Sequence, residues 1–185
     1  MPHVLIAADD EWLIDEVRSA LEGLEVDDRT VDDRSGVTFT ICNTGQAVVP
    51  AAVHRTPDLA VLDLQMGSMG GMAVCMSLRL DESGGRLPHI KVLILLDRAA
   101  DLHLARRAGA DGWLLKPLDP VRLSHAARRI LRGDHVYEGL PAGMPAHAPD
   151  GVPLPATPPD PASAEVAEAS GADGESARGD EVAAS

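Results

Sequence analysis

Short apolar runs recur along most of the chain and alternate with longer segments of helical spacing. Runs of strand length occupy residues 4–8, 37–42, 59–62, 92–96 and 112–115. Apolar residues between these runs repeat every three or four positions, which predicts helices near residues 12–24, 46–55, 72–80, 99–108 and 118–131. Because strands that alternate with helices favour a parallel sheet covered on both faces, the pattern predicts a doubly wound α/β fold with five parallel strands and five helices.

Two segments fall outside this pattern. Residues 25–35 are highly charged and repeat the motif Val-Asp-Asp-Arg, so we expect a surface loop inserted before the second strand. From Val136 onward the chain has nine acidic residues and one basic residue, and thus −8 of the total net charge of −13. This segment also holds eight of the fourteen prolines, and it cannot bury enough apolar surface to offset the entropy of ordering. We therefore expect a folded domain over residues 1–135 and a disordered tail over residues 136–185.

The remaining composition bears on the compartment and on the class of partner. Cys42 and Cys75 are the only cysteines and lie in no metal or redox motif, which is typical of a reducing compartment. No apolar stretch approaches the length of a membrane span, and the first apolar run is too short for a signal peptide. A net negative charge also opposes binding to DNA. We expect a cytoplasmic protein that binds neither membrane nor nucleic acid.

Chemically distinctive residues stand where the predicted strands end. Asp63 ends the third apolar run and precedes the glycine-rich segment 64–71, Asp9 and Asp10 follow the first run, and Lys116 follows the last. The carboxyl ends of parallel strands meet at one edge of a sheet, where ligands of open α/β sheets bind. Carboxylates beside a lysine suit a magnesium ion and a phosphoryl group. Asp9 and Asp10 also suit the amino terminus of a helix, where the helix dipole favours acidic side chains.

These residues, in this order, resemble the receiver domain of bacterial two-component response regulators. The most specific stretches are residues 61–64, with Gly71 downstream, and residues 108–117. The resemblance covers about residues 3–132 and implies a flavodoxin-like doubly wound fold. It further implies a phosphoryl group transferred from a sensor histidine kinase to Asp63, which would be the phosphoacceptor.

The resemblance also implies roles for the neighbouring residues. Mg²⁺ would be held by Asp63, by the acid pair and by the backbone carbonyl of Gln65. An alignment on the first helix makes Asp9 and Asp10 the acid pair, whereas an alignment on the first strand leaves Asp9 alone. Lys116 would bind a phosphoryl oxygen, and its bond to Pro117 is one that the family often builds as cis.

The chain departs from the receiver pattern at the switch positions. Receivers normally end the fourth strand with Thr or Ser, but Leu96 or Asp97 takes that place here, and residues 84–123 contain no Ser, Thr or Tyr. The aromatic switch position is filled by Trp113, which is too bulky to swing easily. The usual hydroxyl switch therefore cannot operate, whereas the residues for phosphorylation are retained.

The leading hypothesis is a single-domain response regulator that has no output domain and is not an enzyme. It would signal through contact with a protein partner that the sequence does not identify, and its fourth and fifth helices are candidates for a homodimer face. The alternative is a receiver-like adaptor that binds its partner independently of phosphorylation, which Leu96 and Asp97 favour. A phosphatase similar to haloacid dehalogenases would need a second aspartate where Gln65 stands.

Overall fold

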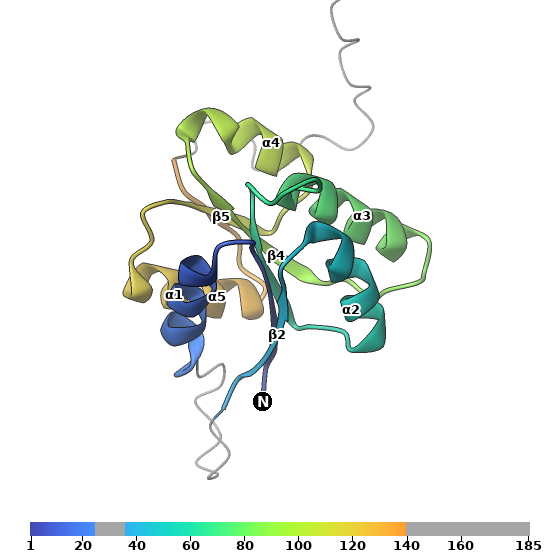
Figure 1. Ribbon diagram of the computed structural model, residues 1–185, viewed down its shortest axis with the longest axis horizontal. Helices are drawn as coiled ribbons and strands as arrows, with labels where there is room; N and C mark the ends of the chain where they lie inside the picture. The colour runs from blue at the N-terminus through green and yellow to red at the C-terminus, as the bar shows by residue number, and fades with distance from the viewer. Residues whose placement is uncertain (25–35, 140–185) are drawn as a thin grey trace, which may run out of the picture. The chain divides into compact units, whose positions relative to one another are not determined.

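The computed structural model describes residues 1–24 and 36–139, and within them six parallel strands form one sheet (Figure 1). The strand order is β2-β1-β3-β4-β5-β6. The strands are β1 (His3–Ala7), β2 (Thr38–Cys42), β3 (Leu59–Asp63), β4 (Lys91–Leu96), β5 (Gly112–Leu115) and β6 (Val136–Tyr137). The helices are α1 (Glu11–Leu21), α2 (Val48–His54), α3 (Gly71–Ser83), α4 (Leu102–Arg107) and α5 (Pro120–Leu131), with short 3-10 turns η1 (Gly45–Ala47) and η2 (Ala99–Asp101) before α2 and α4.

The strand order confirms the doubly wound α/β fold with five helices that the apolar pattern predicts. The expected insertion, residues 25–35, and residues 140–185 of the expected tail lie outside the described residues. None of the described helices has the length and apolar character that a membrane crossing requires.

Side chains of the central strands alternate between two apolar layers. Helices α1 and α5 cover one face of the sheet, and α2, α3 and α4 cover the other (Figure 1). The first layer includes Ile6, Val61, Leu93 and Leu114, and the second includes Leu5, Leu62, Ile94 and Leu96. Burial on both faces explains why these strands are continuous apolar runs rather than alternating ones.

The sheet has six strands, and the prediction of five was wrong. Val136 and Tyr137 pair with Gly112 and Trp113, so β6 extends the sheet beyond β5. A strand of two residues has no detectable period, and the aromatic partner of Tyr137 is distant in sequence, so a local pattern could not reveal this strand. The described fold therefore continues past the expected boundary at residue 135, to residue 139.

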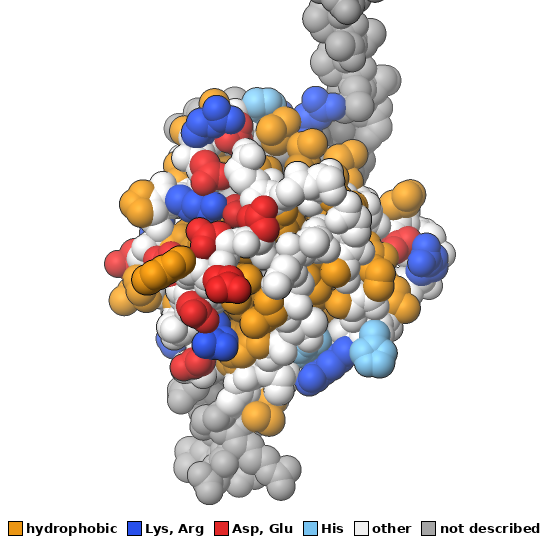
Figure 2. Space-filling model, viewed as in Figure 1, with side chains coloured by type: hydrophobic (Ala, Val, Ile, Leu, Met, Phe, Trp, Pro, Cys, Tyr) orange, Lys and Arg blue, Asp and Glu red, His pale blue; other side chains and the backbone are white. Residues whose placement is uncertain are grey.

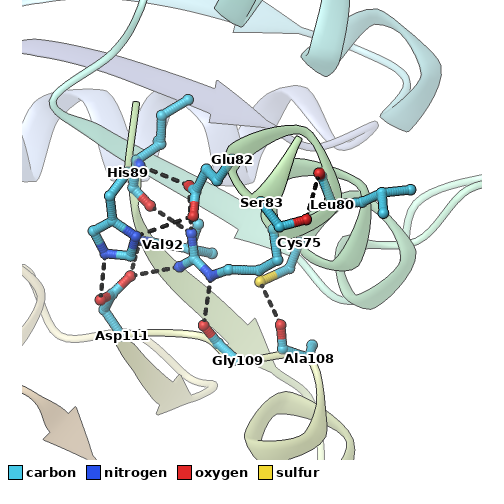
Figure 3. Close-up of polar contacts among 11 residues, drawn as sticks. Cys75, Leu80, Glu82, Ser83, His89, Val92, Ala108, Gly109 and Asp111 are labelled. Atoms are coloured by element: carbon cyan, nitrogen blue, oxygen red, sulfur yellow. Dashed lines mark hydrogen bonds and ion pairs between the residues drawn. The ribbon is translucent and has the colours of Figure 1, made fainter. Parts of the chain in front are cut away.

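A cluster of charged side chains joins α3 to the amino ends of β4 and β5 (Figure 3). The Arg79 guanidinium contacts Glu82 at 2.6 Å and Asp111 at 2.7 Å. The imidazole of His89 contacts the same two carboxylates, at 3.0 Å and 3.2 Å. Backbone N–H groups of Ile90 and of β4 also donate to these carboxylates, which are nearly buried. This group, the Arg79 cluster, closes the end of the sheet opposite the candidate site.

Candidate functional site

The carboxyl ends of four neighbouring strands carry Asp9, Asp63, Asp97 and Lys116 to one edge of the sheet. The order of the strands reverses between β1 and β3, and this is the switch point at which ligands of open α/β sheets bind. On the face seen in Figure 2, acidic side chains gather around the start of α1 and above it. The fold thus brings the acidic residues and the lysine that the sequence singled out to the same edge.

Asp63 is buried and forms an ion pair with Lys116. Its side chain is 4% exposed, and its Oδ1 accepts a hydrogen bond of 2.7 Å from Nζ of Lys116. The backbone N–H of Gln65 donates to the same oxygen at 3.4 Å. The peptide bond between Lys116 and Pro117 is cis, as the resemblance implied. The pair joins the ends of β3 and β5 across the intervening strand β4.

Burial and electrostatic attraction act in opposite directions on the pKa values of this pair. Burial raises the pKa of the Asp63 carboxyl above its ordinary value, although the neighbouring Lys116 opposes that shift. Burial alone would lower the pKa of Lys116, but the attraction of Asp63, and then of Asp97, outweighs it and leaves the pKa of Lys116 raised. Lys116 is therefore a cation at neutral pH, whereas burial disfavours the charged form of Asp63 and Lys116 favours it.

Asp63→Asn is expected to become more stable relative to the wild type as the pH rises from about 4 to about 7. A group whose pKa is raised by folding contributes stability below its unfolded pKa, and this contribution is lost as the pH rises through the folded pKa. Asn imitates the protonated carboxyl at every pH. Urea midpoints of both proteins, measured without divalent cations, test the difference, and a difference that does not depend on pH would contradict the raised pKa.

The glycine-rich loop packs directly against the end of β3. A Cβ atom at Gly71 would overlap the backbone carbonyl of Asp63, so only glycine lets the start of α3 approach the strand so closely. Gly67 has a φ of 21°, and its N–H donates to Oδ2 of Asp9 at 3.0 Å. The loop after Asp63 is thereby tied to the end of β1.

The two acids of the predicted pair have different surroundings. Asp10 caps α1, because its carboxylate accepts from the backbone N–H of Trp12 at 2.9 Å. Asp9 instead reaches the loop that follows Asp63, through the N–H of Gly67. The helix-terminus interpretation thus describes Asp10, while Asp9 is the acid that faces the β3 loop.

The oxygen donors at this edge are of the kind that magnesium binds. No group of three His, Cys, Asp or Glu side chains within residues 1–24 and 36–139 is arranged to enclose a metal ion. Magnesium does not need such a cage, because it binds through one or two carboxylates and keeps several waters. The carboxylates of Asp9 and Asp63 and the backbone carbonyl of Gln65 fit this requirement by the type of donor.

The two residues at the end of β4 point to opposite faces of the sheet. Leu96 is fully buried in the layer under α2, α3 and α4. Asp97 is the next residue, so its side chain lies on the other side, where Oδ1 is 3.1 Å from Nζ of Lys116. Of the two candidates for the missing hydroxyl, it is therefore Asp97 that reaches the site.

Trp113 is fully buried, and it contacts Tyr137 of the last strand and Glu138, the residue that follows the strand. Its ring centroid lies 4.4 Å from that of Tyr137, and its indole N–H donates to the backbone carbonyl of Glu138 at 2.9 Å. The Glu138 carboxylate accepts from the N–H of Leu115 at 2.8 Å and pairs with Arg122. Sequence reasoning missed Tyr137, Glu138 and Arg122, because nothing in their local spacing indicates that they meet β5.

Hollows on the surface of the described residues include two that can be compared with the site. The smaller one, of about 220 Å³, adjoins the site and is lined by Asp10, Trp12, Leu13, Glu16, Lys116, Pro117 and Leu118. The larger, of about 490 Å³, lies between α3 and α4, away from Asp63. The candidate site is therefore assigned from the side chains at the strand ends and not from the volume of a hollow.

Comparison with known proteins gives matches to regulatory proteins. The sequence-family model of the response regulator receiver domain matches residues 4–128 of this chain. The chain is 34% identical over 132 residues to the DNA-binding dual master transcriptional regulator RpaA of Synechocystis sp., which covers 71% of this chain and 50% of RpaA. It is 32% identical over 154 residues to the transcriptional regulatory protein CseB of Streptomyces avermitilis, covering 80% of this chain and 58% of CseB. The chain thus spans about half the length of these relatives.

Solved structures show the same fold. The chemotaxis response regulator CheY4 of Vibrio cholerae has a TM-score of 0.57 at 20% identity, over 70% of this chain and 98% of CheY4. The receiver domain of a histidine kinase from Syntrophus aciditrophicus has a TM-score of 0.59 at 23% identity, over 78% of this chain and the whole of that chain. At these identities the likeness concerns the fold alone, and the family rests on the match over residues 4–128. This chain belongs to the response regulator receiver domain family.

Proposed function

We propose that this chain accepts a phosphoryl group on Asp63 from a phosphohistidine of a sensor histidine kinase and then signals through contact with a protein partner. The observation that carries the proposal is the buried Asp63 carboxylate, paired with Lys116 at the switch point of the sheet. A carboxylate nucleophile needs no general base at neutral pH, but it must overcome repulsion from an anionic donor. Because the pKa of Lys116 is raised, its ammonium group is charged at neutral pH and can offset this repulsion.

In the proposed reaction, an Asp63 carboxylate oxygen attacks phosphorus while the bond from phosphorus to the histidine nitrogen breaks. The electron pair of that bond leaves with the imidazole, and Asp63 becomes an acyl phosphate. Lys116 already lies 2.7 Å from Asp63 Oδ1, so its ammonium group can bind a phosphoryl oxygen as the charge arrives. Asp9, Asp63 and the carbonyl of Gln65 would hold Mg²⁺, which supplies further positive charge beside the phosphoryl oxygens.

The second candidate function is an adaptor that binds its partner regardless of phosphorylation. It is favoured by the contact between Asp97 and Lys116, because a carboxylate stands where receivers place a hydroxyl. RpaA is described as binding DNA, but this chain covers only half of RpaA, and its net charge of −13 opposes DNA binding. We therefore propose a protein rather than a nucleic acid as the output partner in either case.

Incubation with acetyl phosphate and Mg²⁺ is expected to add one phosphoryl group, which intact-mass measurement detects. Asp63→Asn should abolish the adduct, because an amide cannot act as the nucleophile, and chelation of Mg²⁺ should suppress it in the wild type. Asp134→Asn is the matched control, since Asp134 is an exposed partner of Arg129 away from the site. An adduct that survives Asp63→Asn, or no adduct in the wild type, would refute the assignment and leave the adaptor.

A further inference from the structure

Two carboxylates share the ammonium group of Lys116. Asp63 Oδ1 lies 2.7 Å from Nζ and Asp97 Oδ1 lies 3.1 Å from it. The Asp63 side chain is 4% exposed, whereas that of Asp97 is 37% exposed. Asp97 therefore approaches Lys116 from the solvent side, on the loop between β4 and η2.

This arrangement affects any anion that arrives at Asp63. An ammonium group has three N–H donors, and Asp97 engages one of them before a phosphoryl group can bind. Asp97 also places a negative charge within reach of the incoming anion, and like charges in a partly buried site repel over several ångströms. A phosphoryl group at Asp63 must therefore displace the Asp97 carboxylate from Lys116 or bind beside it.

We propose that Asp97 is a positioning residue that holds Lys116 in the unphosphorylated state and lowers the affinity of the site for a phosphoryl group. The proposal rests on the proposed function, because it assigns Asp97 a role toward the group that Asp63 would accept. It makes Asp97 a counter-charge at the position where receivers use a hydroxyl to attract the phosphoryl group. Asp97 should favour Mg²⁺ and disfavour the anion, so its removal should change the two affinities in opposite directions.

The test is a titration with beryllofluoride, a phosphoryl mimic, at saturating Mg²⁺, followed by backbone amide chemical shifts. Asp97→Asn and Asp97→Ala should each bind the mimic about tenfold more tightly than the wild type, which corresponds to about 1.4 kcal/mol. Separate titrations with Mg²⁺ alone should show weaker binding in both variants. Asp134→Asn removes the same charge elsewhere and should bind the mimic within about twofold of the wild type.

Each outcome decides between specific alternatives. If only Asp97→Asn binds the mimic more tightly, the gain comes from the amide as a hydrogen-bond donor. This result would overturn the proposal that the negative charge of Asp97 weakens binding. Equal binding in all proteins would overturn the proposal while leaving phosphorylation at Asp63 intact. Weaker binding of the mimic in both Asp97 variants would show that Asp97 supports binding of the phosphoryl group, and this result would also overturn the proposal. If no protein binds the mimic and the wild type forms no adduct with acetyl phosphate, both the proposed function and the role of Asp97 fail.

Discussion

Arg79→Met is expected to lower the free energy of unfolding by about 3–5 kcal/mol, the range for breaking a buried ion pair by removal of one partner. The guanidinium contacts Glu82 and Asp111, whose side chains are 11% and 12% exposed. It also donates to the backbone carbonyls of Gly109 and Ile90. Without it, two nearly buried carboxylates would lose their guanidinium partner and keep contacts with backbone N–H groups and with the exposed imidazole of His89.

Urea denaturation of the variant measures this loss, and two further variants make it interpretable. Arg79→Lys keeps the charge but cannot reproduce the forked guanidinium contacts, so an intermediate loss is expected. Arg18→Met removes an exposed ion pair with Asp15 on α1 and should change stability by less than about 1 kcal/mol. A loss in Arg79→Met no larger than in Arg18→Met would show that the Arg79 cluster does not stabilise the fold.

The fold could be predicted because both faces of its central strands are buried. The runs at residues 59–62 and 92–96 contain only apolar side chains, which indicates central strands of a parallel sheet without any knowledge of their neighbours. Asp63 and Lys116 could be selected for a related reason, because polar residues that directly follow such runs must lie at the sheet edge. Their contact at 2.7 Å follows from the topology.

The remaining features depend on contacts that no local pattern encodes. Whether Leu96 or Asp97 reaches Lys116 depends on where β4 leaves the sheet, since a shift of one residue reverses the faces. Which of Asp9 and Asp10 caps α1, and which faces the loop after β3, likewise depends on the residue at which α1 begins. The Arg79 cluster joins residues from α3, from the following loop and from the position just before β5. The whole of β4 and α4 separates Asp111 from the other members in sequence, so no local spacing indicates that they meet.

The last strand was missed for the same reason, and its contribution leads to a second prediction. A chain that ends at residue 135 is expected to be about 2–4 kcal/mol less stable than a chain that ends at residue 139. The shorter chain lacks Glu138, the acceptor for both the indole N–H of Trp113 and the backbone N–H of Leu115. An unsatisfied buried donor costs about 1–3 kcal/mol, less where water can enter, and the Tyr137 ring would no longer cover Trp113.

Denaturation in urea, followed by tryptophan fluorescence, compares these two chains with the full-length protein. The chain that ends at residue 139 should keep the full-length midpoint and slope, because the acidic, proline-rich composition of residues 140–185 predicts little apolar burial. Equal stability of the two shortened chains would mean that β6 adds nothing to the sheet. A loss already present at residue 139 would instead show that residues 140–185 contribute to folding. The expected result therefore requires the loss to arise between residues 135 and 139, where Tyr137 and Glu138 contact β5.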